Sequence, residues 1–361
     1  MYSLLRPLLF KLPPETAHDV SMSSLSLIAK HAYLTAKTRQ IYADKVPSLP
    51  VNIMGLSFDN PLGLAAGLDK NARAFKAFSA LGFSSVEMGT VTPLPQAGNP
   101  KPRMFRLAED RSIINRMGFN SEGIDIFLDN IDTDDSAVVG INIGKNKITP
   151  NECAIDDYIN AMESVYKYAD YITINISSPN TASLRDLQAK EPLNELLHAV
   201  KEKQITLQRL LQRYVPIALK IAPDLNMEEI AIISDLVIKH QFDALIATNT
   251  TIARPSALKS ENREEAGGLS GASLKHESTN VIESFYQHLK GQVPIIGVGG
   301  IETTEDAWQK LLSGADYLQI YSGLIYHGPE MIQEIVGGLK QKIEQLGFTD
   351  LNTAMQEMRQ H

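Results

Sequence analysis

The sequence predicts an α/β protein whose main domain is a closed (β/α)8 barrel, or TIM barrel, with a small N-terminal helical extension. Eight short apolar segments alternate with eight amphipathic segments along the chain, as repeated strand–helix units require. Some of these segments, such as 138–143 (VVGINI) and 294–300 (PIIGVGG), are nearly continuous apolar runs, which is typical of parallel strands covered on both faces. A chain of 361 residues with 43% hydrophobic residues can bury the core of such a barrel.

Two helices and a hairpin are predicted before the barrel. The first helix is expected over residues 4–10 and the second over 15–36. A linker with two prolines follows, and residues 51–58 (VNIMGLSF) predict a small hairpin that leads into the main domain.

The barrel units then follow in order. The predicted strands cover residues 62–67, 85–89, 138–143, 171–177, 217–221, 244–248, 295–298 and 317–321. The predicted helices cover residues 71–81, 121–130, 154–168, 193–213, 227–240, 278–289, 304–312 and 330–346. A long proline-rich loop is expected between the second strand and its helix.

The composition excludes several classes of function. A net charge of −8 without any Lys/Arg cluster argues against a nucleic-acid binder. The single cysteine, Cys153, builds neither a disulfide framework nor an iron–sulfur or zinc site, so it is interpreted as a small hydrophobic residue in a protein of a reducing compartment. No group of His, Cys and acidic residues has the spacing of metal ligands, and no metal site is predicted.

Residues 1–45 are predicted to form a separate segment before a barrel domain of residues 46–361. Six Lys/Arg against three Asp/Glu give this segment a charge of +3, so the other residues carry −8 − 3 = −11. None of its apolar clusters approaches the ~18 residues that span a bilayer. A signal peptide is not expected, because Arg6, Pro7 and Lys11 interrupt the apolar run. The segment is therefore predicted to be a basic, amphipathic appendage.

The carboxyl ends of the predicted strands carry mostly small, amide, hydroxyl or lysine residues, and in a (β/α)8 barrel these ends converge on the active site. In strand order they are Ala65, Ala66, Gly67, Leu68, Asp69 and Lys70; Gly89 and Thr90; Asn142; Asn175, Ser178 and Asn180; Lys220; Thr248, Asn249 and Thr250; Gly299 and Gly300; and Tyr321, Ser322 and Gly323. At any single strand the same residues also suit a turn with side-chain caps. Eight such ends on one rim predict a site.

Glycine clusters predict that the ligand carries a phosphate. Gly299-Gly300 and Gly323 stand near helix starts, where backbone N–H groups can approach a phosphate. The loops after the seventh and eighth strands are the usual phosphate site of this fold, and residues 267–271 (GGLSG) could close over the same group. Each cluster alone is also compatible with an ordinary turn.

Two lysines stand in the predicted site. Lys220 lies within a buried strand, where an unpaired ammonium is costly, so it needs an anionic partner. A reduced flavin ring would provide one, and an ion pair with a core carboxylate is the less favoured alternative because the strands show no inward acid. Lys70 is either a ligand contact or an exposed lysine at a helix start.

Together these motifs resemble those of dihydroorotate dehydrogenases. In chain order they are AAGLDK (65–70), TPLPQAGNPKPRMFRL (92–107), NRMGFN (115–120), NISSPNT (175–181), LKIAPD (219–224), TNTT (248–251), GGLSG (267–271), GVGG (297–300) and YSG (321–323). They cover nearly the whole chain in the order of that family. The resemblance implies a barrel that binds one non-covalent FMN and oxidises (S)-dihydroorotate to orotate in pyrimidine (UMP) biosynthesis.

Two features are similar to the class 2, quinone-dependent and membrane-associated branch of that family. Ser178 precedes Pro179-Asn180 where the soluble fumarate- or NAD-linked branch has a cysteine, and the basic segment 1–45 resembles the appendage of class 2. The resemblance implies ubiquinone or menaquinone as the electron acceptor and a peripheral location on the inner face of a bacterial cytoplasmic membrane. It implies no iron–sulfur partner subunit.

The resemblance also implies roles for matching positions. FMN would be held by Ala65, Ala66, Gly67, Leu68, Asp69, Thr90, Asn142, Asn175, Lys220, Thr248, Gly271, Gly300, Tyr321 and Ser322. Dihydroorotate would be held by Lys70, Asn115, Arg116, Met117, Gly118, Phe119, Asn175, Asn180, Asn249 and Thr250. Ser178 would take the proton from C5, with Thr181 and a bound water as relay and Phe119 as gate. His18, Arg106 and Tyr321 would contact the quinone head group.

Three alternatives stay open from the sequence. Another FMN barrel oxidoreductase, of the dihydropyrimidine- or dihydrouridine-reducing kind, would explain the phosphate loops but not NRMGFN together with SSPN. A phosphate-binding barrel isomerase would need no flavin and would be colourless. A non-enzymatic membrane-docking scaffold would explain residues 1–45 and leave the polar strand ends unexplained.

Overall fold

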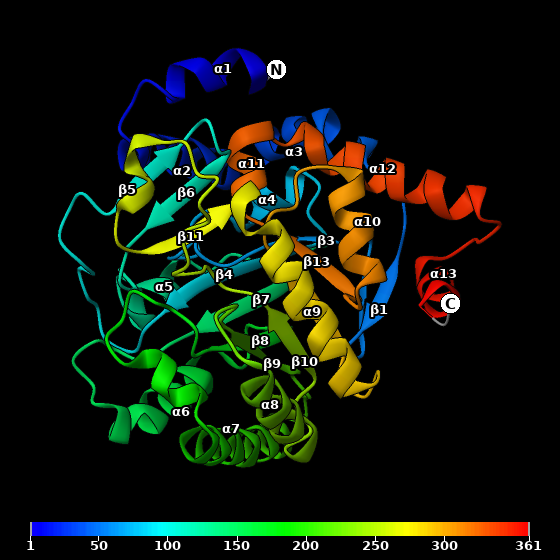
Figure 1. The fold of residues 1–361 in the computed structure, drawn as a ribbon. Coiled ribbons are helices and arrows are strands. Elements are labelled where there is room, and N and C mark those ends of the chain that lie inside the picture. The colour runs from blue at the N-terminus through cyan, green and yellow to red at the C-terminus, as the bar shows by residue number, and fades with distance from the viewer. Residues whose placement is uncertain (1, 360–361) are drawn as a thin grey trace.

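The computed structural model describes residues 2–359, and its centre is a closed barrel of eight parallel strands (Figure 1). In order around the barrel the strands are β3 (Leu62–Leu64), β4 (Ser85–Val91), β7 (Val138–Ile143), β8 (Tyr171–Asn175), β9 (Ile217–Ile221), β10 (Ala244–Ala247), β12 (Ile295–Val298) and β13 (Tyr317–Ile320). Pairing of β13 with β3 closes the barrel. The predicted fold class is confirmed.

Helices surround this barrel and bury an apolar side against it (Figure 1). They are α4 (Phe75–Ala80), α5 (Ile124–Asn130), α6 (Ala154–Val165), α7 (Lys190–Leu211), α8 (Met227–Lys239), α9 (Lys275–Leu289), α10 (Thr304–Leu312) and α12 (Glu330–Gln345). Capping boxes begin α8 and α10, where the Asn226 and Thr303 side chains accept backbone N–H groups of the first turn.

The first barrel helix begins later than predicted. The sequence predicts a helix over 71–81, and α4 begins at Phe75. The buried carboxylate of Asp69 accepts the N–H groups of Arg73 and Ala74, each at 2.8 Å, and so holds the intervening residues in a loop.

The predicted helix over 15–36 is two helices. α2 (Pro14–Lys30) and α3 (Ala32–Ile41) meet at His31, whose backbone is extended with φ −119° and ψ 106°. The Thr35 hydroxyl donates at 2.8 Å to a carbonyl group in the last turn of α2, and so satisfies an acceptor that the end of that helix leaves free. Apolar spacing continues across the break, so periodicity does not reveal it.

The predicted long loop after the second barrel strand contains a hairpin. β5 (Met104–Leu107) and β6 (Ser112–Asn115) pair antiparallel, and β11 (Gly268–Gly271) pairs with β6 to make a three-stranded sheet outside the barrel (Figure 1). Strands of four residues are too short for a clear alternation of apolar and polar positions, and the sequence therefore did not predict them.

The smaller elements agree only in part with the sequence. The predicted hairpin before the barrel is confirmed as β1 (Val51–Ile53) and β2 (Leu56–Phe58), and both residues between them have positive φ, as in a type I′ turn. α11 (Ser322–His327) and α13 (Leu351–Met358) are not among the predicted helices.

The first helix, α1 (Tyr2–Leu9), lies against α11. The Arg6 guanidinium donates to the Tyr326 carbonyl at 2.8 Å, and the Tyr2 hydroxyl donates to the Ile325 carbonyl at 2.6 Å. Within residues 2–359, no helix is both long enough and apolar enough to cross a membrane.

A fully buried lysine lies between α10 and α9. Lys310 Nζ donates to Ser278 Oγ at 2.5 Å and to Thr279 Oγ1 at 3.0 Å. Burial lowers the pKa of Lys310 to about 7, because the interior disfavours the charge and the nearby Asp306 offsets only part of that effect.

This lysine should make stability depend on pH. Between about pH 7 and pH 10 the unfolded chain keeps a proton that folded Lys310 has released, so the free energy of unfolding should rise by about 1.4 kcal/mol per pH unit from this group. Lys310→Met should remove that rise, and Lys190→Met, at an exposed position, should keep it. Urea unfolding at several pH values measures the slope; equal slopes for all three proteins would contradict the assignment.

Candidate active site

A cavity of about 1030 Å³, counting the part open to solvent, lies at the carboxyl ends of the barrel strands. The predicted site residues that line it are Ala65, Ala66, Gly67, Lys70, Thr90, Asn115, Met117, Gly118, Phe119, Asn175, Ser178, Asn180, Lys220, Thr248, Asn249, Thr250, Gly271, Gly300, Tyr321 and Ser322. Ser270, from the predicted GGLSG stretch, also lines it, and so do Leu274, Ile301 and Gln319, which the sequence did not single out. The strand ends therefore meet in one place, as expected for this fold.

Other predicted site residues lie outside this lining. Arg116 points to the neighbouring loop, where its guanidinium pairs with Glu265 at 2.7 Å. Both oxygen atoms of the Asp69 carboxylate accept hydrogen bonds from the backbone N–H groups of Arg73 and Ala74, just before α4. Leu68, Thr181 and Asn142 are buried next to residues that line the cavity.

A chain of amide and hydroxyl side chains joins the ends of β4, β7, β8 and β10. Thr90 Oγ1 donates to Asn142 Oδ1 at 2.5 Å, and Asn175 Nδ2 donates to both residues at 3.0 and 3.1 Å. Ser177 Oγ donates to Asn175 Oδ1 at 2.9 Å and accepts from Asn249 Nδ2 at 2.9 Å. Each member fixes the orientation of the next, so the amides that face the cavity are held in place before any ligand binds.

The loop after β8 presents Ser178 to the cavity. Ser178 Oγ accepts the Asn180 N–H at 3.3 Å, and Asn180 Nδ2 donates to the Asn115 carbonyl at 3.0 Å. Thr181 Oγ1 is buried and has no hydrogen-bond partner among the described residues. A buried hydroxyl of this kind is normally satisfied by an ordered water.

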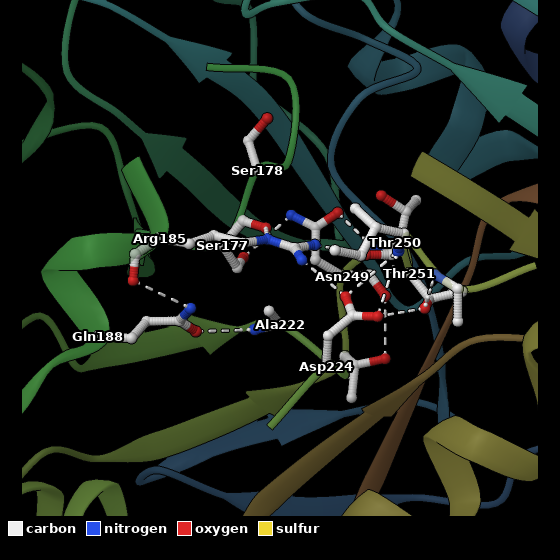
Figure 2. Close-up of polar contacts among 12 residues, drawn as sticks. Ser177, Ser178, Arg185, Gln188, Ala222, Asp224, Asn249, Thr250 and Thr251 are labelled. Carbon is white, nitrogen blue, oxygen red and sulfur yellow. Dashed lines mark hydrogen bonds and ion pairs between the residues drawn. The ribbon is translucent and has the colours of Figure 1, made fainter. Parts of the chain in front are cut away.

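Arg185 holds this loop to two neighbouring loops (Figure 2). Its guanidinium donates to the Ser177 carbonyl at 3.0 Å, to the Thr250 carbonyl at 2.8 Å and to Asp224 Oδ2 at 2.6 Å. In Figure 2 the Ser178 hydroxyl points away from these contacts. The sequence did not predict Arg185, because its partners lie 8, 39 and 65 residues away along the chain.

Lys220 has a buried acid beside it, which corrects the expectation that the strands carry none. Lys220 Nζ lies 3.8 Å from Glu87 Oε1, and both side chains are buried. Burial lowers the pKa of Lys220, and the Glu87 carboxylate opposes that shift. Glu87 lies on β4, in a segment whose other residues are mostly apolar or small, and the sequence alone does not tell which face it occupies.

Lys70 is not at a helix start, since α4 begins at Phe75. Its Nζ donates to Asn120 Oδ1 at 2.5 Å. Burial, together with the positive charge of Arg103, lowers the pKa of Lys70 to about 7. A lysine with this pKa gains its proton readily when an anion binds next to it.

Glycines and hydroxyls also line the cavity, and together they form a glycine cradle. Gly271, Gly299 and Gly300 have φ of 98°, 119° and 68°, which favour glycine, and a Cβ at Gly300 would lie 2.8 Å from the backbone nitrogen of Lys275. The Ser270 and Ser322 hydroxyls are 2.8 Å apart at its rim. Such a set of backbone N–H groups and hydroxyls suits a phosphate.

The predicted quinone contacts lie in three separate parts of the chain: His18 on α2, Arg106 on β5, and Tyr321 between β13 and α11. Burial lowers the pKa of His18, on α2, to about 4, and the Lys70 charge adds to that effect. Arg106, on β5, donates to the Phe10 carbonyl at 3.1 Å and stacks 4.2 Å from the Phe10 ring. Tyr321 lines the cavity, and burial raises its pKa to about 12.

No group of three or more His, Cys, Asp and Glu side chains within residues 2–359 is arranged to hold a metal ion. The cavity lining instead offers amides, hydroxyls and lysines as groups that can bind a ligand.

Known proteins resemble this chain over nearly its whole length. The family model for dihydroorotate dehydrogenase matches residues 48–343. Relatives from Methylobacillus flagellatus and Marinobacter nauticus, both named dihydroorotate dehydrogenase (quinone), are 52% and 51% identical and cover 93% and 95% of this chain, over 98% and 100% of their own lengths. The ligand-free DHODH of Eimeria tenella has a TM-score of 0.85 at 41% identity, over 94% of this chain and 98% of its own.

The Arg185 contacts predict a local effect on the loop after β8. Arg185→Met should lower the free energy of unfolding by about 2 kcal/mol, because it leaves Asp224 without its cation and two carbonyls without a donor. Amide hydrogen exchange over residues 176–182 should become faster. Arg213→Met is a matched control, since Arg213 pairs with Asp170 and the Lys167 carbonyl instead. Equal exchange in both variants would contradict the role of Arg185.

Proposed function

The chain belongs to the dihydroorotate dehydrogenase family and is a flavin-using, quinone-dependent oxidoreductase of pyrimidine biosynthesis, and from this premise we propose how its residues divide the work. The flavin is FMN, one per chain and not covalently bound. The observation that carries this proposal is one cavity that joins a phosphate-fitting glycine cradle to Ser178 through a fixed set of amides. FMN, when bound, accepts a hydride from C6 of dihydroorotate.

The residues of the cavity fit FMN in two ways. The cradle of Gly271, Gly300 and Ser322 suits its phosphate, because glycines there leave backbone N–H groups open to the cavity. Deeper in the barrel, Lys220 offers a cation and Gln319 an amide oxygen that has no partner among the described residues, as a polar ring system requires. Ala65, Ala66, Gly67, Thr90, Asn142, Asn175, Thr248 and Tyr321 would complete the flavin site, with Leu68 and Asp69 supporting the first loop.

Dihydroorotate would lie among the amides next to Ser178. Asn115, Asn175, Asn180 and Asn249 offer both donors and acceptors, which a cyclic ureide with N–H and carbonyl groups requires. Lys70 would neutralise the carboxylate of the substrate. Thr250 and the backbone of Met117 and Gly118 would close the site, and Arg116 would act through its loop.

Ser178 would take the proton from C5. A serine is a weak base by itself, so the proton needs an exit. The buried Thr181 hydroxyl, which lacks a partner, could hold a water that receives it, and Phe119 at the cavity wall would gate that route. Ubiquinone or menaquinone would be the electron acceptor, and His18, Arg106 and Tyr321 would be the polar contacts for the quinone head group.

Residues 1–45 would form the membrane- and quinone-docking segment, and residues 46–361 the catalytic domain. Three leucines of α1, Leu4, Leu5 and Leu8, are 79%, 51% and 62% exposed, while α1 is fastened to α11 by Arg6 and Tyr2. Exposed leucines on a fastened helix suit shallow insertion among acyl chains. Lys11, Lys30 and Lys37 are also exposed and suit anionic headgroups, whereas Arg39 pairs with Asp135 at 2.6 Å. The protein would thus be peripheral on the inner face of a bacterial cytoplasmic membrane.

The first test separates this function from the other barrel functions. The purified protein should show a flavin spectrum that dihydroorotate bleaches anaerobically, and a short-chain quinone should restore the spectrum faster than fumarate or NAD. Ser178→Ala should keep its flavin and lose ~10²–10⁴-fold in the rate of bleaching, as expected for loss of a general base.

Two companion variants sharpen the result. Ser178→Cys should retain part of the rate, because a thiolate can accept the same proton, and Thr181→Val should slow bleaching if the threonine belongs to the relay. Near-normal bleaching by Ser178→Ala would leave Ser178 only as a cap on the Asn180 N–H.

A second test addresses the docking segment. Deleting residues 1–45 would bare core contacts of Met22, Leu25 and Ile28, so replacing Leu4, Leu5 and Leu8 by Ser is the cleaner change. Each buried leucine is worth ~1.5–3 kcal/mol, so liposome binding should fall at least ~10-fold. Reoxidation by a long-chain quinone in liposomes should slow, while bleaching by dihydroorotate should not change.

The exposed leucines Leu210 and Leu211, at the end of α7, provide the control. Their replacement by Ser should leave liposome binding and both half-reactions unchanged. If the α1 variant still binds liposomes like the unaltered protein, α1 is not the docking surface.

A further inference from the structure

A fully buried carboxylate lies inside the barrel, next to the cavity but outside its lining. Glu87 Oε1 accepts from Asn142 Nδ2 at 2.7 Å, and Glu87 Oε2 accepts from Gln319 Nε2 at 2.7 Å and from the Tyr171 hydroxyl at 3.0 Å. The Glu87 side chain has no exposed surface. An acid so deep in a barrel is costly unless its partners satisfy it, and here donors from three other strands do.

Two partners of Glu87 face the cavity. Lys220 Nζ is 3.8 Å from Glu87 Oε1, and Gln319 is fixed through its amide nitrogen, which also donates to the Tyr171 hydroxyl at 3.1 Å. The Gln319 amide oxygen has no partner among the described residues. Gln319 is fully buried, and it belongs to the cavity lining. Glu87 thus fixes the amide and lies beside the cation that the barrel interior presents to a ligand.

The interior is shaped to hold this arrangement. Gly140, on β7, is the register partner of both Glu87 and Tyr171, and a Cβ at Gly140 would lie 2.3 Å from the Tyr171 ring. Any larger residue at this position would move the phenol that donates to Glu87. In this layer of the barrel, Tyr171 and Gln319 therefore donate to the Glu87 carboxylate, and Gly140 leaves the space that the Tyr171 ring needs.

We propose that Glu87 is a positioning residue of the flavin site, which orients Lys220 and Gln319 and supplies the counter-charge that, together with Lys220, sets the midpoint potential of the flavin. This inference rests on the proposed function, because it requires a flavin in the cavity. Flavin reduction adds negative charge, which Lys220 stabilises and Glu87 opposes. The pair leaves the interior near neutrality, so neither charge alone dominates the potential.

The charged and titratable groups around Glu87 are Lys220 on β9, Tyr171 on β8 and Tyr317 on β13. Burial and the Glu87 carboxylate raise the pKa of Tyr171, and burial raises that of Tyr317, so both phenols stay neutral over the useful pH range. Because Glu87 opposes the fall in the Lys220 pKa, removing its charge should let Lys220 lose its proton at a lower pH. The variant should therefore change the titration of Lys220.

The test is a double-mutant cycle on the flavin-loaded protein, with the midpoint potential measured against pH. At low pH, Glu87→Gln should have the highest potential, Lys220→Met the lowest, and the double variant should lie with the unaltered protein between them. Each single change should alter the equilibrium constant for reduction at least tenfold, which is about 30 mV for a two-electron couple. The midpoint potential of Glu87→Gln should fall to that of the unaltered protein as pH rises, because Lys220 then loses its charge.

A second readout needs no flavin. In apoprotein labelled with ¹³C at the lysine side chains, the resonance that Lys220→Met removes should titrate at a lower pH in Glu87→Gln. Asp243→Asn is the matched control. Asp243 also accepts from a tyrosine and a glutamine, but it directly precedes the amino end of β10, whereas the cavity lies at the carboxyl ends of the strands. It should change neither the potential nor this titration.

The outcomes separate the two proposals. A protein that binds no flavin, or whose flavin dihydroorotate does not bleach, overturns the proposed function. A protein that works normally, but in which Glu87→Gln changes neither the potential nor the Lys220 titration, overturns this inference alone. If Glu87→Gln does not fold, equal potentials for Lys220→Met and the unaltered protein overturn the charge pair in the same way.

Discussion

The arrangement of the barrel interior depends on the cost of burying charge. Glu87 has no access to water, and its carboxylate is stable there only because Asn142, Tyr171 and Gln319 all donate to it. Satisfying Glu87 uses donors from β7, β8 and β13, and so fixes the side chains that stand directly below the ligand cavity. Asn142 links Glu87 to the strand ends, since it also accepts hydrogen bonds from Thr90 and Asn175 there.

The loops at the carboxyl ends of the strands also depend on a charged group whose hydrogen bonds are satisfied. The Arg185 guanidinium is satisfied by two backbone carbonyls and Asp224, and these partners belong to the loops after β8, β9 and β10. A planar group with five donors suits this task, because one side chain can join three backbone segments in fixed directions. Ser178 therefore stands on a loop that the rest of the rim holds in place, rather than on a free turn.

The elements added to the barrel are linked to one another by ion pairs and hydrogen bonds. Glu15, at the start of α2, pairs with Arg103 at 2.8 Å, while Arg106 reaches the chain between α1 and α2. The three-stranded sheet meanwhile contributes Asn115 and Gly271 to the cavity wall. The N-terminal helices are thus joined to the sheet that forms part of the cavity wall.

The sequence by itself determined the barrel and most of the cavity lining, because both follow from local rules. Strand and helix periodicity, glycine at positive φ and polar residues at strand ends are properties of short segments, and a closed barrel brings such ends together. The tertiary structure alone decided the pairing of Glu87 with Lys220, the three contacts of Arg185, and the turning of Arg116 toward Glu265. These depend on which side chains meet across strands and loops far apart in the chain. Barrel closure and register set those meetings, and no local pattern of residues records them.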